Sequence, residues 1–351
     1  MSFSMHTNGK LLLTAEYFVT DGAVALALPT KLGQSLEVKK QKEEGLTWQS
    51  LDAEGNVWFE CHFSLPRLAI KRCEGEENKN QVAQQLQAIL RQAKKLNPDF
   101  LKGKKGLKAT TKLDFDRNWG LGTSSTLITM VAKWAEADPF QLLGHTFGGS
   151  GYDIAAATAD QPFLFQLFNG QPRWDKSIFN PVFKDQLYFV YLGKKQSSKE
   201  AMVWYTVTPE EERGENLARI TQITHDIARN ATLASRESFQ LLRNVTDKAT
   251  TKLSTSITQK VADSNQYEDE LRAFDALIVE HEELVQEIIK QPRAKTEYFS
   301  DYWGEIKSLG GWGGDFVLAT SSKNDEVTKE YFHNKGFETV FTYAELIKDG
   351  E

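Results

Sequence analysis

The segment NWGLGTSSTLITMVAKW, residues 118–134, places two glycines and three hydroxyl residues directly before an apolar run with helical spacing. Glycine permits backbone turns that a side chain blocks, and a following helix directs free N–H groups and its positive dipole end at the turn. Because the strand-like KLDFD, residues 112–116, comes before it, we expect a strand, a tight turn and a buried helix. Such a turn can hold a phosphate. On this stretch alone, a simple helix N-cap explains the same residues equally well.

The familiar phosphate-binding loops do not match this turn. No segment supplies the G-x-x-x-x-G-K-[ST] of a P-loop. A dinucleotide fold needs a third glycine after Gly120 and Gly122 and an acid ending the next strand, whereas Asp138 lies at a helix end. A nucleophile elbow needs a glycine two residues after its serine, and Ser124 lacks one. The remaining possibility is a cradle of backbone N–H groups for a polyphosphate, with a hydroxyl of Thr123 or Ser124 for Mg²⁺.

Composition narrows the class of protein. A chain of 351 residues suits two domains or one large α/β domain, and its 40% hydrophobic and 26% charged residues are ordinary for a soluble globular protein. The net charge of −6 argues against nucleic acid as a partner. We expect no membrane partner, since no apolar run approaches the ~20 residues that span a bilayer. Cys61 and Cys73 form no C-x-x-C, so we expect reduced cysteines and a cytoplasmic location. For the oligomeric state we expect a monomer or homodimer.

Strands and helices are mixed along the chain, which predicts an α+β fold. Alternating apolar residues and turn signals predict strands in the first half at residues 11–19, 23–29, 35–40, 46–52, 57–63 and 112–116. Helical spacing predicts helices at residues 80–98 and 125–137, near residue 152, and then at 211–245 and 265–291. The change in character places a boundary near residues 170–186.

Two further glycine-rich stretches stand before regular elements. GGSGYDIAAATADQP, from Gly148, has Asp153 in the first turn of an expected helix, where the dipole favours an ionised carboxylate that can accept a proton. The alternative is a simple helix N-terminal charge. KSLGGWGGDFVLATS, from Lys307, gathers four glycines around Trp312 before an expected strand, so it is either a loop that approaches a ligand or a glycine-rich hairpin.

These three segments, preceded by NGKLLLTAEYFVTDGAVALALPT at residues 8–30, together resemble the GHMP kinase superfamily over nearly the whole chain. The first motif is similar to G-K-[LV]-x-L-x-G-E-[HY]-x-V-x-x-G-x-x-A-x-A and the second to G-L-G-S-S-A. The third resembles the G-S-G-x-D of the mevalonate branch, with the GYDIA string of a bacterial subgroup, and the last resembles G-A-G-G-G-D. The first motif is carried by Gly9, Lys10, Leu11, Leu13, Glu16, Tyr17, Val19, Gly22, Ala25 and Ala27.

The resemblance implies a two-domain GHMP kinase fold. Residues 1–175 would form an N-terminal ATP-binding domain like the second domain of ribosomal protein S5, and residues 176–351 a ferredoxin-like C-terminal domain. It also implies a kinase that uses ATP and Mg²⁺ on a small molecule. The Glu16-Tyr17 pair and the segment LGKKQSSKEAM look closest to the phosphomevalonate and mevalonate kinase branch, which would place the protein in isoprenoid biosynthesis.

Site residues follow from the matching positions. Lys10 and Asp153 would be catalytic, the lysine as a fixed cation and the aspartate as the proton acceptor. The resemblance assigns ATP binding to Gly120, Leu121, Gly122, Thr123, Ser124 and Ser125, with Ser124 also on Mg²⁺. It assigns substrate binding to Glu16, Tyr17, Ser150, Gly151, Ser197, Ser198, Gly310, Gly311, Gly313 and Gly314. We expect Asp116 and Glu16 to be structural rather than catalytic.

The chain also departs from the family pattern. Asn118 and Trp119 stand where a proline often precedes G-L-G, and Trp312 stands where a glycine is usual, so its bulk is expected to narrow the phosphate passage or stack on a ligand. The acid or amide that often assists Mg²⁺ has no match, and His145, roughly in its place, is expected to be structural. Two other functions stay open: a diphosphomevalonate decarboxylase, in which Lys10 would be unexpected, and a non-catalytic binding protein of the same fold.

Overall fold

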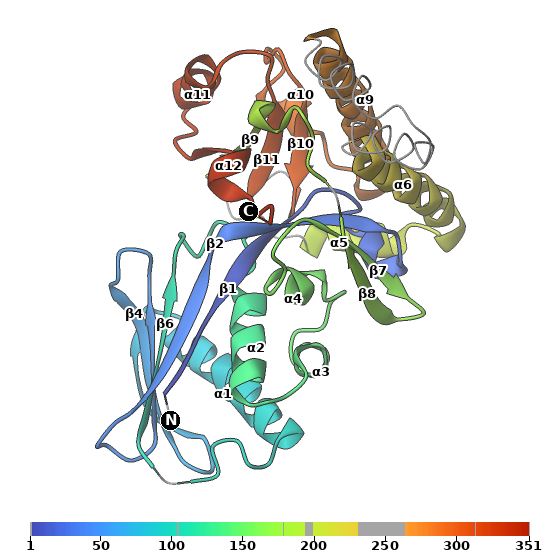
Figure 1. The fold of residues 1–351 in the computed structure, drawn as a ribbon. Coiled ribbons are helices and arrows are strands. Elements are labelled where there is room, and N and C mark those ends of the chain that lie inside the picture. Colours follow the sequence, from blue (N-terminus) through green and yellow to red (C-terminus); the bar gives the residue numbers. More distant parts are fainter. Residues whose placement is uncertain are drawn as a thin grey trace, which may run out of the picture. The chain divides into compact units, whose positions relative to one another are not determined.

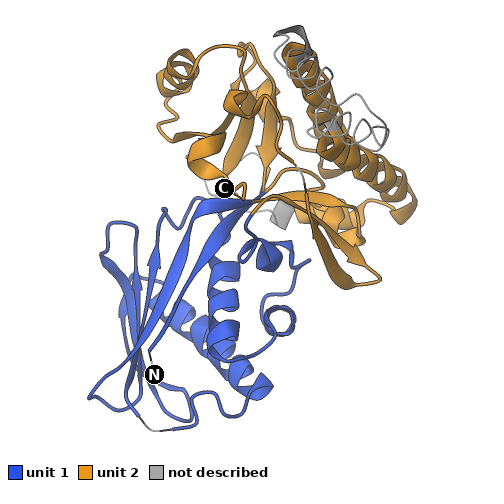
Figure 2. Cartoon of the chain, in the orientation of Figure 1, with its two compact units in different colours: residues 1–11, 29–160 blue, residues 12–28, 161–351 orange. Residues whose placement is uncertain are grey.

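The computed structural model describes residues 2–103, 105–177, 179–193, 199–230, 264–312 and 314–350. The chain divides into two compact units (Figure 2). Unit 1 comprises Met1–Leu11 and Pro29–Asp160, and unit 2 comprises Leu12–Leu28 and Gln161–Glu351. The domain boundary expected between residues 175 and 176 stays a prediction.

Unit 1 is built on a mixed β-sheet. Its strands run in the order β5-β4-β3-β6-β2, with β1 paired to β2. Figure 1 labels β4, β6, β2 and β1 of this sheet. The central strands β3 and β6 are parallel, and the neighbouring pairs β2–β6, β3–β4 and β4–β5 are antiparallel. The bounds are β1 Phe3–Leu12, β2 Ala25–Lys40, β3 Leu46–Leu51, β4 Val57–Ser64, β5 Ala69–Gly75 and β6 Leu107–Leu113.

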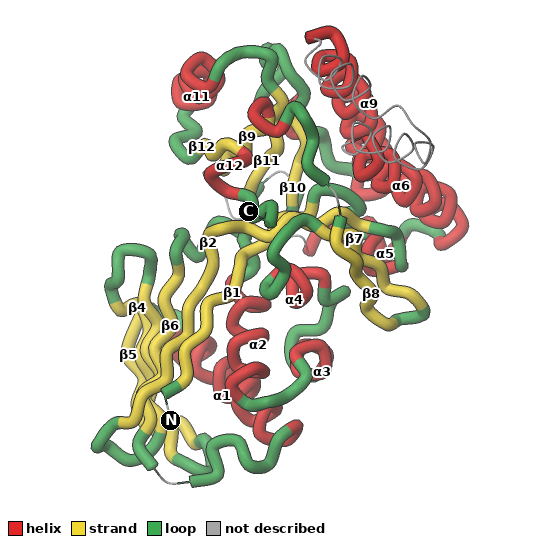
Figure 3. Tube along the Cα trace, in the orientation of Figure 1, coloured by secondary structure: helices red, strands yellow, loops and turns green. Residues whose placement is uncertain are grey.

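Helices cover one face of this sheet (Figure 3). They are α1 Lys79–Leu96, α2 Thr123–Trp134, α3 Pro139–Gly144 and α4 Tyr152–Ala156. The core forms because strand residues alternate between faces while helix residues recur every third or fourth position, so each element presents one apolar side. That side carries Leu36, Val38, Trp48, Phe59 and Phe63 from the strands and Leu86, Ile89, Leu90, Ile128 and Val131 from α1 and α2.

Unit 2 contains a β-hairpin and an antiparallel sheet. The hairpin strands β7 Phe163–Phe168 and β8 Gln171–Lys176 pair with each other, and β7 also pairs with Ala25–Ala27 of β2. The sheet has the order β10-β11-β9-β12, with β9 Leu187–Tyr191, β10 Ile306–Leu309, β11 Phe316–Thr320 and β12 Val340–Thr342. Its core is rich in aromatic side chains, among them Tyr188, Phe299, Tyr302 and Phe332.

The helices of unit 2 include two long ones that pack against each other, α6 Glu210–Asn230 and α9 Ser264–Ile289, and α9 also contacts β10. The shorter helices are η1 Phe18–Asp21, η2 Lys184–Gln186, α5 Lys199–Val207, α10 Ala294–Tyr298, α11 Asp325–Asn334 and α12 Tyr343–Leu346. The helix predicted for residues 211–245 is seen as α6, and residues 231–245 lie outside the described residues.

The strand predicted at residues 11–19 is wrong beyond its start. β1 ends at Leu12, and the 3₁₀ helix η1 begins at Phe18. Between them, Ala15 and Tyr17 adopt left-handed φ angles of 65° and 67°, which a residue with a Cβ rarely takes. The apolar pattern of this stretch reflects burial in a turn rather than a place in a sheet.

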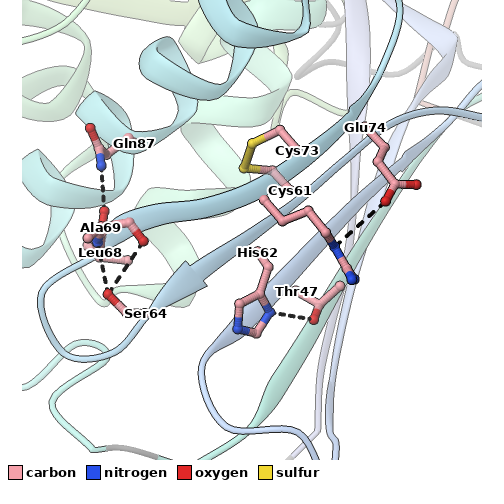
Figure 4. The surroundings of a disulfide bond; sticks show 10 residues. Thr47, Cys61, His62, Ser64, Leu68, Ala69, Cys73, Glu74 and Gln87 are labelled. Atoms are coloured by element: carbon pink, nitrogen blue, oxygen red, sulfur yellow. Dashed lines mark hydrogen bonds and ion pairs between the residues drawn. A yellow bond between two sulfur atoms is a disulfide. The ribbon is translucent and has the colours of Figure 1, made fainter.

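A disulfide joins Cys61 of β4 to Cys73 of β5, so the expectation of reduced cysteines is wrong (Figure 4). The two residues are direct partners in the antiparallel register, and their Cα atoms are 4.1 Å apart. Opposed residues of neighbouring strands point to the same face, so their side chains are within reach of each other. The strand pairing that brings them together was not visible in the spacing of the two cysteines.

Within the described parts of the chain, no helix combines the length and the apolar character needed to cross a membrane.

Candidate functional site

The turn before α2 is organised by an aspartate. Asp116 accepts the Asn118 N–H through Oδ1 at 2.8 Å and the Trp119 N–H through its carbonyl oxygen at 2.9 Å. The Trp119 ring stacks on Phe115, with centroids 6.4 Å apart. These contacts shape the turn without the proline that the family pattern places there, and they give Asp116 a structural role.

Gly122 lies where the first motif and the glycine turn meet in unit 1. It adopts a φ of 90°, and a Cβ added to it would lie 3.0 Å from Lys10 Cγ and 3.4 Å from Lys10 Cε. The Lys10 N–H donates to the Leu121 carbonyl at 3.1 Å. Glycine is therefore required here both by the backbone angle and by the passage of the lysine side chain.

Helix α2 begins directly after this turn. Its first backbone bond runs from the Thr126 N–H to the Gly122 carbonyl at 3.1 Å, so the amides of Thr123 to Ser125 have no acceptor within the helix. Ser124 is exposed, whereas Ser125 is only 4% exposed. The start of α2 thus offers backbone donors and an exposed hydroxyl, which is the arrangement expected for an anion site.

Asp153 is brought to this turn by the packing of α4 on α2. Gly151 precedes α4 with a φ of 87°, and Asp153 is the second residue of the helix. The Ser125 hydroxyl donates to Asp153 Oδ2 at 2.6 Å. The Tyr152 ring lies 5.7 Å from the Lys10 ammonium. Unit 1 therefore gathers the predicted cation, the predicted base and the glycine turn around one place.

The glycine-rich loop after β10 has a different character from the one expected. Trp312 is 1% exposed, and its Nε1 donates to the Pro292 carbonyl at 3.0 Å. The expectation that this side chain narrows a passage or stacks on a ligand is therefore wrong, because the ring anchors the loop inside unit 2. Of the loop glycines, Gly310, Gly311 and Gly314 are described. Gly313, with Ser197 and Ser198, lies outside the described residues.

The described residues contain no group of three or more His, Cys, Asp or Glu side chains that would hold a metal ion on its own. His145 is exposed and follows the last residue of α3, where its N–H bonds to the Gln141 carbonyl at 3.1 Å. His145 is therefore the C-cap residue of α3, which is a structural role.

A buried charge cluster holds Glu16 in unit 2. We use the name "buried charge cluster" for Glu16, His281, Glu282 and Lys307, none of which is more than 2% exposed. The Lys307 ammonium lies 2.8 Å from Glu16 Oε1 and 3.6 Å from Glu282 Oε1. His281 Nε2 accepts the Ala15 N–H at 2.8 Å, which supports the left-handed turn at Ala15.

Burial dominates the protonation of this cluster. It raises the pKa of Glu16, against the opposing charge of Lys307, and raises the pKa of Glu282 to about 7. Burial and the charge of Lys307 hold the pKa of His281 well below 6.5. The His281–Glu16 contact of 3.5 Å is therefore not an ion pair, since the imidazole is neutral. Burial also raises the pKa of Tyr17, which keeps its phenol protonated.

The sequence contains one signal for this cluster outside the four motifs. His281 and Glu282 lie on the same stripe of α9 as the fully buried Ile278 and Val285. Charged residues at apolar positions of a helical pattern are rarely buried without a partner. The pattern therefore indicates a buried partner, but it does not identify Lys307, which lies on strand β10.

We expect the Glu282→Gln variant to lose part of the pH dependence of stability. Burial raises the pKa of Glu282 from the ordinary 4.5 of a glutamate to about 7, so the folded state holds this proton up to a pH of about 7. Its contribution to the free energy of unfolding therefore falls as pH rises through that window, by roughly 2–3 kcal/mol. Urea unfolding at pH 5 and pH 8 measures this, and the difference between the two should shrink in the variant. Equal differences in both proteins would show that Glu282 does not titrate in this window.

Comparisons with known proteins address the fold. No protein-family model and no curated sequence matches the chain. Among solved structures, Methanococcus jannaschii mevalonate kinase aligns with a TM-score of 0.63 at 14% identity, covering 97% of both chains. Streptococcus pneumoniae phosphomevalonate kinase, in complex with phosphomevalonate and AMPPNP, aligns at 0.59 and 12% identity over 97% of this chain and 99% of that one. Lactococcus lactis galactokinase, complexed with galactose, aligns at 0.58 and 11% over 100% and 94%.

These likenesses confirm the predicted α+β class and GHMP kinase fold. At such low identity they establish the fold alone, and they include proteins named for both sugar and mevalonate-pathway substrates.

Proposed function

We propose that this protein is an ATP-dependent kinase that transfers the γ-phosphoryl group to a small molecule of the mevalonate pathway, phosphomevalonate or mevalonate. The observation that carries the proposal is the arrangement within unit 1. The Ser125–Asp153 hydrogen bond of 2.6 Å joins the glycine turn to the carboxylate, and Lys10 packs against Gly122 of the same turn.

Phosphoryl transfer needs these parts. An acceptor oxygen attacks the γ-phosphorus, the bond from that phosphorus to the β-phosphate oxygen breaks, and ADP leaves. Lys10 supplies a fixed positive charge for the phosphoryl oxygens, and Asp153 takes the acceptor proton. The amides at the start of α2, with Gly120, Leu121 and Gly122, hold the triphosphate. Held in place, the reactants need little further ordering to reach the transition state.

Mg²⁺ fits this site as a companion of the nucleotide. The ion takes one or two protein oxygens and completes its shell with water and phosphate, so a large cluster of acidic residues is not required. Ser124 is exposed in the first turn of α2 and offers a hydroxyl oxygen to the ion. Bound there, Mg²⁺ would neutralise charge on the phosphates.

Residues from four segments make up the proposed acceptor side. Ser150 and Gly151 lie three and two residues before the proposed base Asp153. Because the base must reach the acceptor, we assign both residues to contact with the acceptor. We assign Glu16, Tyr17, Gly310, Gly311, Gly313, Gly314, Ser197 and Ser198 to the acceptor by the resemblance of their motifs. For Glu16, the described structure instead has the carboxylate buried against Lys307, so its contribution would be to hold the turn.

The test supplies ATP and Mg²⁺ with mevalonate, phosphomevalonate, homoserine or galactose and measures ADP release. Stimulation by mevalonate or phosphomevalonate alone supports the proposed acceptor class. Stimulation by galactose or homoserine instead would keep the kinase and reject that class. In a separate reaction supplied with diphosphomevalonate and ATP, release of carbon dioxide would identify the decarboxylase alternative. ATP binding without turnover on any acceptor would favour the non-catalytic alternative.

We expect Gly122→Ala to impair turnover strongly. The new Cβ would lie 3.0 Å from Lys10 Cγ, and a left-handed residue with a side chain costs roughly 1–2 kcal/mol. Since small displacements of a reacting group are costly, we expect kcat to fall by about 10²-fold.

Gly336→Ala is the matched control for this variant. Gly336 has a φ of 88°, and an added Cβ would meet nothing within 4 Å. It should therefore lower stability by a similar amount and leave turnover unchanged. Comparable losses of turnover in the two variants would show that backbone strain, rather than displacement of Lys10, is responsible.

A further inference from the structure

The hydroxyl of Ser125 is directed to a carboxylate. Ser125 is 4% exposed, and its Oγ donates to Asp153 Oδ2 at 2.6 Å. Ser124, the preceding residue in the same helical turn, is exposed. Adjacent residues of a helix point about 100° apart, so the side chains of the two serines face different environments. The Ser124 hydroxyl is accessible to a ligand, whereas the Ser125 hydroxyl is buried and hydrogen-bonded to Asp153.

The Asp153 carboxylate is fixed at both of its oxygens. Oδ2 accepts the Ser125 hydroxyl at 2.6 Å, and Oδ1 accepts the Ile154 N–H at 3.0 Å. A carboxylate has about four acceptor positions, so two bonds set the plane of the group and leave capacity for a further proton donor. Both partners are donors, as an ionised carboxylate requires.

This hydroxyl is a feature of this chain rather than of the pattern that the chain resembles. The sixth position of G-L-G-S-S-A is alanine, which has no polar atom in its side chain. Here that position is Ser125, at the third residue of α2. The chain therefore adds, on α2, a hydrogen-bond donor that contacts Asp153.

We infer that Ser125 is a positioning residue for Asp153, whose hydroxyl holds the carboxylate in one orientation, and that it does not bind the nucleotide through its side chain. The inference rests on the proposed function, since a held carboxylate matters when it must meet an acceptor proton. A base must lie within hydrogen-bond reach of the proton it takes, so a carboxylate free to rotate spends less time in a productive orientation.

Two consequences separate this role from a role in ATP binding. If the hydroxyl holds the base, Ser125→Ala lowers kcat, by about 10-fold, and leaves the KM for ATP unchanged. If the hydroxyl instead binds phosphate, the same variant raises the KM for ATP. Alanine suits a helix and occurs at this position in the family pattern, so we expect the variant to fold.

The matched control is Thr129→Val. Thr129 lies four residues further along α2, is 3% exposed, and its Oγ1 has no hydrogen-bond partner among the described residues. Valine keeps its shape and removes its hydroxyl. This variant loses a buried hydroxyl from the same helix without touching Asp153, so kcat and KM should stay as in the wild type.

A spectroscopic readout tests the contact without turnover. In protein labelled with ¹³C at the aspartate carboxyl carbon, the Asp153 resonance is the one that disappears in Asp153→Asn. Loss of a donor to a carboxylate changes the environment of that carbon, so Ser125→Ala should shift the Asp153 resonance and Thr129→Val should not. Thermal unfolding of each variant verifies that the fold is kept.

Three results would overturn the inference: an unmoved Asp153 resonance in Ser125→Ala, an unchanged kcat, or a kcat loss matched by Thr129→Val. A raised KM for ATP with unchanged kcat in Ser125→Ala would show that the Ser125 hydroxyl binds the nucleotide. Absence of turnover in the wild-type protein with every acceptor would be a failure of the proposed function. In that case the carbon resonance still decides whether the hydroxyl holds the carboxylate.

Discussion

Asp153→Asn should lower kcat by about 10³-fold and leave ATP affinity unchanged. An amide has nearly the shape of a carboxylate, and its single oxygen can still accept the Ser125 hydroxyl, which keeps the contact between α2 and α4, while the bond from the Ile154 N–H is lost. What is lost is the ability to accept a proton from the acceptor. ADP release measures the first effect, and calorimetric titration with ATP measures the second.

Asp138→Asn is the control for this substitution. Asp138 caps α3 by accepting the Phe140 and Gln141 N–H groups, and asparagine caps helices about as well as aspartate. The control makes the same chemical change in the same unit and should retain full turnover. Full activity in Asp153→Asn would show that Asp153 is not the base, and weakened ATP binding would place it on the nucleotide.

Lys307→Met should be strongly destabilising. Methionine keeps much of the side-chain volume but leaves Glu16 and Glu282 without the ammonium that lies 2.8 Å and 3.6 Å from them. Removing one partner of a buried charge group typically costs 3–5 kcal/mol. We expect this loss in the free energy of unfolding at pH 8, measured by urea denaturation.

The loss should be smaller at pH 5. Burial raises the pKa of both carboxyl groups, so they take up protons as the pH falls and no longer carry unpaired charge. For the same reason, Glu282→Gln added to Lys307→Met should recover part of the loss at pH 8. Lys335→Met is the control, because Lys335 pairs with Asp301 at 2.7 Å on an exposed surface, where such pairs contribute about 0–1 kcal/mol. Equal losses in the two lysine variants would contradict a special role for the buried charge cluster.

The parts of the site that lie within one short segment were predictable from the sequence. The turn at Gly120 and Gly122 and the helix after it follow from local rules, because glycine angles and helical spacing are properties of neighbouring residues. The same holds for Asp153 at the start of its helix. Family resemblance supplied the fold, which the solved structures confirm.

Contacts between distant segments were not predictable in this way. The Ser125–Asp153 bond depends on how α2 packs on α4, and the Glu16–Lys307 pair joins positions 291 residues apart. Trp312 illustrates the same limit, since a tryptophan among glycines gives no sign of whether it faces a ligand or the core. The turn at Ala15 reads as a strand because burial, rather than sheet pairing, sets its apolar pattern.

The division of the chain has a consequence for the order of synthesis. Residues 12–28 belong to unit 2, yet they are made before nearly all of unit 1, and their partners His281, Glu282 and Lys307 come far later. Chains emerge from the ribosome N-terminus first. All residues of unit 1 are therefore synthesised before the residues of unit 2 that contact residues 12–28. Neither unit corresponds to one continuous stretch of the chain. A fragment that ends at Asp160 would therefore contain residues 12–28 but lack the rest of unit 2, which buries them.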